Sequence, residues 1–186
     1  MADLLKLMEE SGAVLKGHFL LTSGRHSDTY FEKFRILERP DVLSEVCGSI
    51  ADRFRDSGAE LVVGPTTGGI IIAFEVARRL GLPALYVERA DGKRVLRRGA
   101  KLSAGTRALV VDDVFTTGTS VREVVELIRD AGAEVCGVAV LVDRSETPPD
   151  FGVPFYSAVR VEAVSYAPDE VPEWLAAIPI TKPGTR

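Results

Sequence analysis

Two adjacent acids, Asp112 and Asp113, stand just before a turn that is rich in hydroxyl side chains. The turn consists of Thr116, Thr117, Gly118, Thr119 and Ser120. Hydroxyl groups and the unpaired N–H groups of a helix start bind phosphate, and a glycine lets the backbone come close to it. The carboxylates suit sugar hydroxyls or the water shell of Mg²⁺. The segment therefore predicts a sugar-phosphate site, with a helix cap and a plain turn as the alternative reading.

A second candidate phosphate loop lies upstream, where an apolar strand leads into a helix. It consists of Thr66, Thr67, Gly68 and Gly69. Because two neighbouring glycines are unfavourable inside a helix, we expect a tight turn whose N–H groups surround an anion. Pyrophosphate fits such a turn. The alternative is a plain turn that binds no ligand.

A strongly basic segment covers residues 89–101 and contains one acid, Asp91. Its cations are Arg89, Lys93, Arg94, Arg97, Arg98 and Lys101. The two glycines and the low apolar content of the segment predict a mobile loop that closes over a pyrophosphate. The alternative is a solvated charged face. Lys93 is the better proton donor, since Arg stays protonated.

Arg144 follows a later apolar strand, within the run Asp-Arg-Ser-Glu at 143–146. A guanidinium at a strand end binds a ligand carboxylate through two parallel hydrogen bonds. A surface ion pair with Glu146 is the alternative.

Apolar strands and helices alternate from residue 61 onward, which predicts an α/β fold with an open, mainly parallel sheet flanked by helices. The expected strands are 61–63, 84–87, 107–111 and 135–142, and the expected helices are 69–80 and 120–131. Ligands of such a sheet bind beyond the carboxyl ends of its strands. The two phosphate loops, the basic segment and Arg144 all follow strands, so we expect them at one edge.

The remaining segments predict a small N-terminal hood and further elements after the core. In residues 1–40 we expect a helix at 3–10 and strands at 18–22 and 28–34, joined by a turn at 23–26. A helix begins at Pro40 and ends near residue 55. After a proline-rich loop we expect a strand at 156–163 and a short helix at 170–177. With 186 residues the chain has the size of a single domain.

Other features of the sequence exclude several classes of function. The net charge of −4 and the pI of 5.3 argue against a nucleic-acid or membrane surface. Cys47 and Cys136 show no metal or redox spacing, and we expect neither a disulfide nor a metal site with His18 and His26. Charges within the first twenty residues rule out a signal peptide and predict a cytoplasmic protein. The chain contains no Asn and no Gln, which favours a hot-adapted source.

The strand, acidic pair and Thr-Thr-Gly-Thr-Ser loop together resemble the phosphoribosyl pyrophosphate (PRPP) motif of the type I phosphoribosyltransferases. Two further segments are similar to orotate phosphoribosyltransferases: Leu-Thr-Ser-Gly-Arg-His-Ser-Asp-Thr-Tyr-Phe at 21–31, and Val-Asp-Arg-Ser-Glu at 142–146. The resemblance implies transfer of the phosphoribosyl group from PRPP to orotate in UMP biosynthesis, with Mg²⁺. It also implies a PRPP-binding core at 60–145 and a homodimer that shares the 89–99 loop between subunits.

The resemblance also implies roles for individual residues. Asp112 and Asp113 would contact the ribose hydroxyls, and residues 116–120 the 5′-phosphate. Residues 66–69, Arg89 and the catalytic cations Lys93, Arg97 and Arg98 would bind pyrophosphate. The orotate ligands would be Ser23, Tyr30, Phe31, Thr116 and Arg144.

The chain departs from the family pattern at three places. Thr22 and Gly68 stand where many members have Lys, and the common Lys-x-x-Lys-x-His-Gly run is absent from the basic segment. These departures leave two alternative functions open: a phosphoribosyltransferase for a purine or other base, and a nucleotide-sensing regulator of the same fold.

Overall fold

The computed structural model describes residues 3–21, 23–96, 99–161 and 164–182, and the chain divides into two compact units. The larger unit covers residues 40–161, and the smaller unit combines residues 1–39 with 162–186. The N-terminal part of the smaller unit ends at residue 39, and the N-terminal hood was expected to cover residues 1–40. The sequence interpretation had not assigned the C-terminal segment to the same unit as the N-terminal one.

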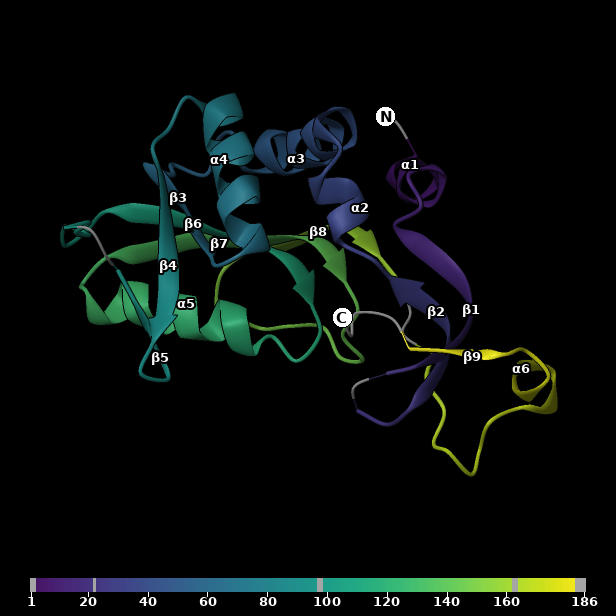
Figure 1. Cartoon of the computed structure of the whole chain (residues 1–186). Coiled ribbons are helices and arrows are strands. Elements are labelled where there is room, and N and C mark those ends of the chain that lie inside the picture. The colour runs from purple at the N-terminus through teal and green to yellow at the C-terminus, as the bar shows by residue number, and fades with distance from the viewer. Residues whose placement is uncertain (1–2, 22, 97–98, 162–163, 183–186) are drawn as a thin grey trace. The chain divides into compact units, whose positions relative to one another are not determined.

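The larger unit contains a six-stranded sheet with the order β5-β4-β3-β6-β7-β8 (Figure 1). Its strands are β3 (Leu61–Pro65), β4 (Ala84–Ala90), β5 (Lys93–Val95), β6 (Arg107–Phe115), β7 (Glu134–Asp143) and β8 (Phe155–Arg160). All neighbouring pairs are parallel except β4 with β5. The predicted open, mainly parallel sheet is confirmed.

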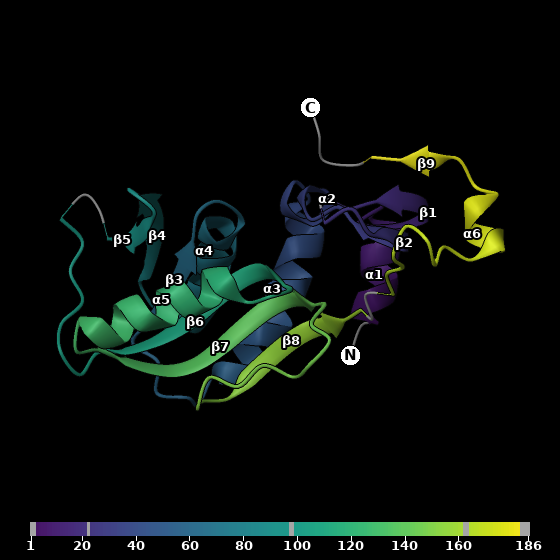
Figure 2. The same ribbon diagram turned by 90° about the horizontal axis from the view of Figure 1, so that it is seen from below.

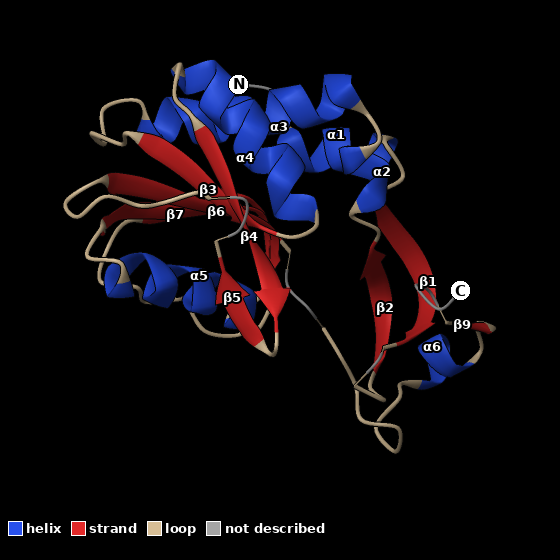
Figure 3. Cartoon of the chain, turned by 60° about the vertical axis from the view of Figure 1, so that its left-hand side comes forward, coloured by secondary structure: helices blue, strands red, loops and turns tan. Residues whose placement is uncertain are grey.

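Three helices cover the two faces of this sheet. Helices α3 (Pro40–Phe54) and α4 (Gly68–Leu80) lie on one face and α5 (Thr119–Asp130) on the other (Figure 3). α5 buries Val121, Val124, Val125 and Ile128. Because these positions recur every three or four residues, they form one apolar stripe against the strands, as the sequence pattern predicts.

The smaller unit is built around a three-stranded sheet with the order β2-β1-β9. Its elements are α1 (Leu4–Glu10), β1 (Val14–Leu20), β2 (His26–Phe31), α2 (Phe34–Leu37), α6 (Glu173–Ala176) and β9 (Ile180–Thr181). β9 pairs in parallel with β1, and Figure 2 shows these elements from the two ends of the chain beside each other. Arg25 also donates hydrogen bonds of 2.8 and 2.7 Å to Ser165.

The basic segment is not the mobile loop that its composition suggested, at least over residues 89–95. Residues 93–95 form β5, which pairs with β4 in a hairpin. Asp91 and Gly92 form the two-residue turn, with φ angles of 50° and 77°. Positive φ at both central positions matches the twist of a hairpin, and Asp-Gly is a preferred pair for this turn. Arg97 and Arg98 lie outside the described residues.

Other boundaries differ by a few residues from those expected. β2 ends at Phe31 and α2 begins at Phe34, where a strand to residue 34 was expected. α6 has four residues, fewer than expected. β8 ends at Arg160, and residues 162–163 of the expected strand lie outside the described residues.

Glu75 links α4 to α3 through a network of hydrogen bonds. Ser44 of α3 donates a hydrogen bond of 2.7 Å to Glu75 Oε1, and Arg79 donates bonds of 3.0 Å to Glu75 and 2.8 Å to Ser44. Arg78 adds two bonds of 2.8 and 2.9 Å. These hydrogen bonds, led by those from Arg78, lower the pKa of Glu75 from 4.5 to about 2. The carboxylate is therefore charged throughout the neutral range.

Replacing Glu75 by Gln should lower the free energy of unfolding at neutral pH by roughly 0.5–1 kcal/mol, the range for partly exposed ion pairs. A carboxyl group whose pKa falls on folding stabilises the native state above its unfolded pKa. The difference in the free energy of unfolding between wild type and Glu75→Gln should therefore narrow as the pH falls from 4.5 towards 2. Denaturant unfolding across this pH range measures that difference, and Glu126→Gln, at an exposed position, is the control. A difference that stays constant between about pH 5 and 3 contradicts the assignment.

Candidate active site

The carboxyl ends of β3, β6 and β7 bring three predicted site segments to one edge of the sheet. Residues 66–69 follow β3, residues 116–120 follow β6, and Arg144 follows β7. β6 pairs in parallel with both β3 and β7, and the backbone N–H of Arg144 donates to the Phe115 carbonyl at 2.8 Å. We call this edge, with the three segments, the carboxyl edge. The expected arrangement of the loops is confirmed.

The acidic pair lies inside β6, because the strand ends four residues later than expected. The strand runs to Phe115, so Asp112 and Asp113 are strand residues with exposures of 6% and 7%. Asp112 Oδ1 accepts from the Asp113 N–H at 2.8 Å, and Asp113 Oδ1 accepts from the Val114 N–H at 2.7 Å. Since successive strand residues point to opposite faces, the two carboxylates cannot act as one side-by-side pair.

The candidate phosphate loop, residues 116–120, packs against an aromatic cluster. Gly118 has φ 75° and precedes the first residue of α5. A Cβ atom on Gly118 would lie 2.3 Å from the Phe115 ring. That ring is itself held by edge contacts with Phe151 and Phe155, with centroids 5.8 and 5.5 Å away. Only glycine permits this approach, which leaves the hydroxyls of Thr116, Thr117 and Thr119 exposed.

In the candidate pyrophosphate loop, residues 66–69, close packing requires the glycine at position 69. Gly68 and Gly69 form the first residues of α4 and do not make a separate turn before it, which corrects the sequence interpretation. A Cβ on Gly69 would lie 2.6 Å from Pro65 Cδ, and a Cβ on Gly64 would lie 2.1 Å from the Gly69 carbonyl oxygen. The Thr66–Thr67 peptide bond is cis. The start of the helix therefore sits directly on the strand end.

The basic hairpin reaches this edge through Arg94, a residue to which the sequence interpretation gave no specific role. Its side chain is 8% exposed and contacts Glu123 of α5 at 3.0 Å. Its guanidinium also reaches Thr66 Oγ1 at 3.5 Å and donates to Ser120 Oγ. Lys93 is exposed. The Asp-Gly pair at 91–92 is the sequence signal that would have predicted the hairpin.

The predicted orotate ligands divide between the two units. Arg144 is half-buried in the larger unit, and Ser23, Tyr30 and Phe31 belong to the smaller one. Phe31 is 6% exposed, whereas neighbouring Tyr30 is half-buried. Because neighbouring strand residues face opposite sides, both rings cannot stack on one ligand. We therefore assign Phe31 to the core. Thr22, which precedes Ser23, lies outside the described residues.

His18 and His26 hydrogen-bond to each other within the smaller unit, with 2.6 Å between Nε2 and Nδ1. His18 Nδ1 also lies 3.1 Å from the Ile178 carbonyl. Both cysteines are free; Cys47 is buried and Cys136 is half-buried. Burial raises the pKa of Cys47 to about 12, which keeps its thiol unreactive.

The carboxylates of the carboxyl edge fit a magnesium ion that is held mainly by its substrate. Among the described residues, no group of three or more His, Cys, Asp or Glu side chains is placed to hold a metal. Each acid of the 112–113 pair already accepts a backbone N–H. Since Mg²⁺ keeps several waters and needs few carboxylates, these residues suit contact through water.

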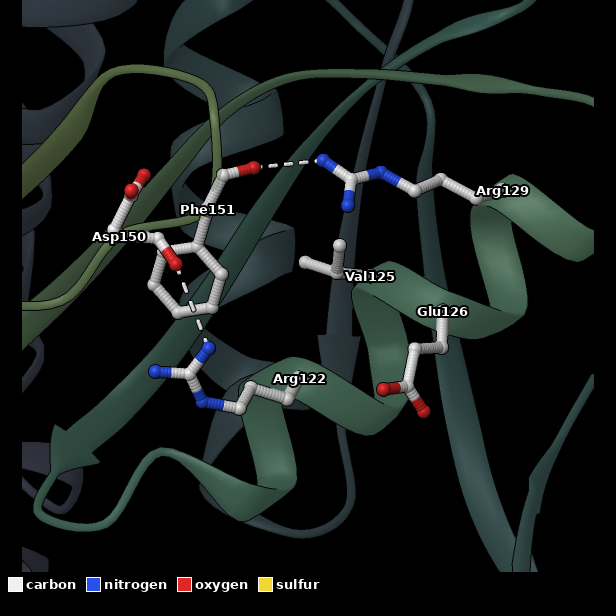
Figure 4. Close-up of a pocket in the computed structure, with 6 residues that line it drawn as sticks. All are labelled: Arg122, Val125, Glu126, Arg129, Asp150 and Phe151. Carbon is white, nitrogen blue, oxygen red and sulfur yellow. Dashed lines mark hydrogen bonds between the residues drawn. The ribbon is translucent and has the colours of Figure 1, made fainter.

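A pocket of about 140 Å³ lies on α5, and none of its lining residues is a predicted site residue (Figure 4). Arg129 donates to the Phe151 carbonyl at 2.7 Å, and Arg122 lies over the Phe151 ring at 5.0 Å. These contacts hold the segment before β8 against α5.

Among the described ranges of the chain, no helix has the length and apolar character to span a membrane.

The family model of the phosphoribosyl transferase domain matches residues 35–154 of this chain. Orotate phosphoribosyltransferase of Pelotomaculum thermopropionicum is 47% identical, over 99% of this chain and 97% of that one. The enzyme of that name from Caldanaerobacter subterraneus is 46% identical, with 98% and 96% covered. The crystal structure of orotate phosphoribosyltransferase from Aeropyrum pernix matches with a TM-score of 0.73 at 33% identity, covering 85% of this chain and 93% of that one. The chain therefore belongs to the orotate phosphoribosyltransferase family.

Replacing Gly118 by Ala should lower kcat/KM for PRPP at least tenfold, roughly 1.4 kcal/mol, since the new methyl group displaces the phosphate loop from the Phe115 ring. Gly81→Ala is the matched control, because Gly81 also has positive φ (71°) but no atom near its Cβ position. Steady-state kinetics and thermal melts of both variants separate the clash from backbone strain. Equal losses in the two variants would refute a specific role for the Phe115 contact.

Proposed function

We propose that the protein catalyses the transfer of the 5-phosphoribosyl group from PRPP to a ring nitrogen of orotate, giving orotidine 5′-monophosphate and pyrophosphate. The reaction takes place at the carboxyl edge. The observation that carries this proposal is the placement of two phosphate loops and Arg144 on adjacent strand ends. The family relationship supports the same reaction, within UMP biosynthesis.

The reaction needs positioning and charge neutralisation and does not need a protein nucleophile. Loop 116–120 binds the 5′-phosphate through its hydroxyls and the N–H groups at the start of α5. Loop 66–69 binds the pyrophosphate, and the acids of β6 accept hydrogen bonds from the ribose hydroxyls. Bound Mg²⁺ would neutralise charge on the pyrophosphate oxygens. Held in line, the nitrogen attacks the anomeric carbon as the pyrophosphate leaves.

The cations of the basic segment bind the leaving pyrophosphate in this proposal. Lys93 is exposed beside the hairpin turn and can donate a proton, whereas Arg89, Arg97 and Arg98 supply fixed charge. Closure of the segment after residue 95 would exclude water, which otherwise hydrolyses PRPP. A cytoplasmic location stays a prediction of the sequence.

Orotate differs from uracil by one carboxylate, which we assign to Arg144, with Thr116 beside the ring. The planar guanidinium fork matches a carboxylate in two hydrogen bonds. A purine base has no such group. Arg144 therefore sets the base specificity in this proposal.

Steady-state assays with PRPP, Mg²⁺ and orotate, uracil, adenine, hypoxanthine or xanthine test the function. We expect turnover with orotate alone. Arg144→Ala should raise the KM for orotate about tenfold or more, because two charge-assisted hydrogen bonds are lost, and leave the KM for PRPP within about twofold. Arg55→Ala, an exposed residue directly after α3, is the control. Turnover with a purine supports the rival enzyme, and no turnover with any base supports a regulator.

We also propose a homodimer in which α4 lies at the interface. Ile71 and Phe74 are 41% and 64% exposed and lie three positions apart on one face of this helix. Exposed large apolar side chains on one helical face are typical of a protein interface. In such a dimer the part of the 89–99 segment beyond β5 can serve the neighbouring site, while β5 stays with its own subunit.

Replacing Phe74 by Glu should weaken the dimer at least about tenfold, since burying a Phe side chain contributes roughly 1.5–3 kcal/mol. Sedimentation velocity over a dilution series measures the dissociation constant. Trp174→Glu is the control, because Trp174 is 54% exposed on α6. A monomeric wild type, or a Phe74→Glu protein with unchanged association, excludes this interface.

A further inference from the structure

We propose that Arg94 is a PRPP-binding residue that links the two phosphate loops, and that Glu123 of α5 is the positioning residue that holds it there. The inference rests on the proposed function, since it takes loops 66–69 and 116–120 as the phosphate sites. It gives a specific role to Arg94, one of the cations of the basic segment, and adds Glu123, to which no role had been assigned.

One guanidinium contacts both loops. Arg94 Nη1 lies 3.5 Å from Thr66 Oγ1, and Nη2 donates a short hydrogen bond to Ser120 Oγ. Thr66 follows β3, and Ser120 is the second residue of α5. The Arg94 side chain is 8% exposed, so its charge lies at a nearly enclosed position. A ligand with a phosphate in each loop places both phosphates next to this one cation.

Two arginines share a single carboxylate at this position. Arg94 Nε donates to Glu123 Oε2 at 3.0 Å, and Arg89 Nη2 donates to the same oxygen at 2.6 Å. Burial of Glu123 opposes its ionisation, but the hydrogen bonds from Arg89 and Arg94 outweigh burial and lower the pKa of this carboxyl. The three side chains therefore carry a net positive charge at neutral pH. That surplus charge favours a polyanionic ligand.

Glu123 connects the hairpin to a rigid part of the fold. β5 has three residues, lies at the sheet edge and pairs with β4. α5, by contrast, is anchored by four buried apolar side chains. An arginine fixed by a carboxylate on such a helix is already ordered before substrate arrives, so less side-chain entropy is lost on binding. The Thr66 and Ser120 hydroxyls are neutral acceptors, and phosphate oxygens replace them as stronger, charged ones.

Kinetics and direct binding of inorganic pyrophosphate test the proposal. Arg94→Met should raise the KM for PRPP about tenfold or more and weaken pyrophosphate binding in calorimetry, with the KM for orotate within about twofold. Arg94→Lys keeps the charge but loses the fork, and should recover part of the loss. Glu123→Ala should raise the KM for PRPP roughly three- to tenfold. Glu126→Ala, an exposed acid on the same helix, should leave it unchanged.

The double variant Arg94→Met, Glu123→Ala separates positioning from a general effect of charge or stability. If Glu123 acts through Arg94, the double variant binds PRPP no more weakly than Arg94→Met alone. Full additivity, a wild-type KM in Arg94→Met, or tighter PRPP binding in Glu123→Ala overturns the inference. A wild type without any phosphoribosyl transfer overturns the proposed function itself, whereas normal transfer with insensitive variants overturns this inference alone.

Discussion

Parallel pairing of β3, β6 and β7 is the constraint on which the candidate site depends. Parallel strands need crossover helices, and those helices return the chain so that every strand ends at the same edge. Loops far apart in the sequence, at 66–69, 116–120 and 144, follow neighbouring strand ends for this reason. A single antiparallel strand among the three would place one loop at the opposite edge.

Steric contact gives these loops their shape. The Phe115 ring, packed on Phe151 and Phe155, leaves no room for a side chain at position 118. The carbonyl of Gly69 leaves none at Gly64. In both loops the backbone is brought onto the strand end by close packing, and the polar groups of the loop are turned outward. The polar face of each candidate phosphate loop is thus supported by the dense packing behind it.

The positive charge near the carboxyl edge is local and comes from the arginines of the β4–β5 hairpin. The chain has a net charge of −4, yet Arg89 and Arg94 both reach α5 through the β4–β5 pairing. Glu123 balances one of the two cations. An acidic protein can therefore present a positively charged site for a polyanion without a broad basic surface.

The sequence by itself determined the sheet class, the strand-loop-helix order and the loop glycines. Apolar runs, helical periodicity and glycine pairs are local signals, and each is set by residues close together in the chain. Tertiary structure alone decided that Phe31 is buried and Tyr30 is not, that Asp112 and Asp113 lie within β6, and that residues 164–182 join the N-terminal strands. It also decided that Arg94 lies between two loops. These outcomes depend on strand length and on pairing between distant segments. The local sequence around a residue does not determine which side chains lie next to it across a sheet.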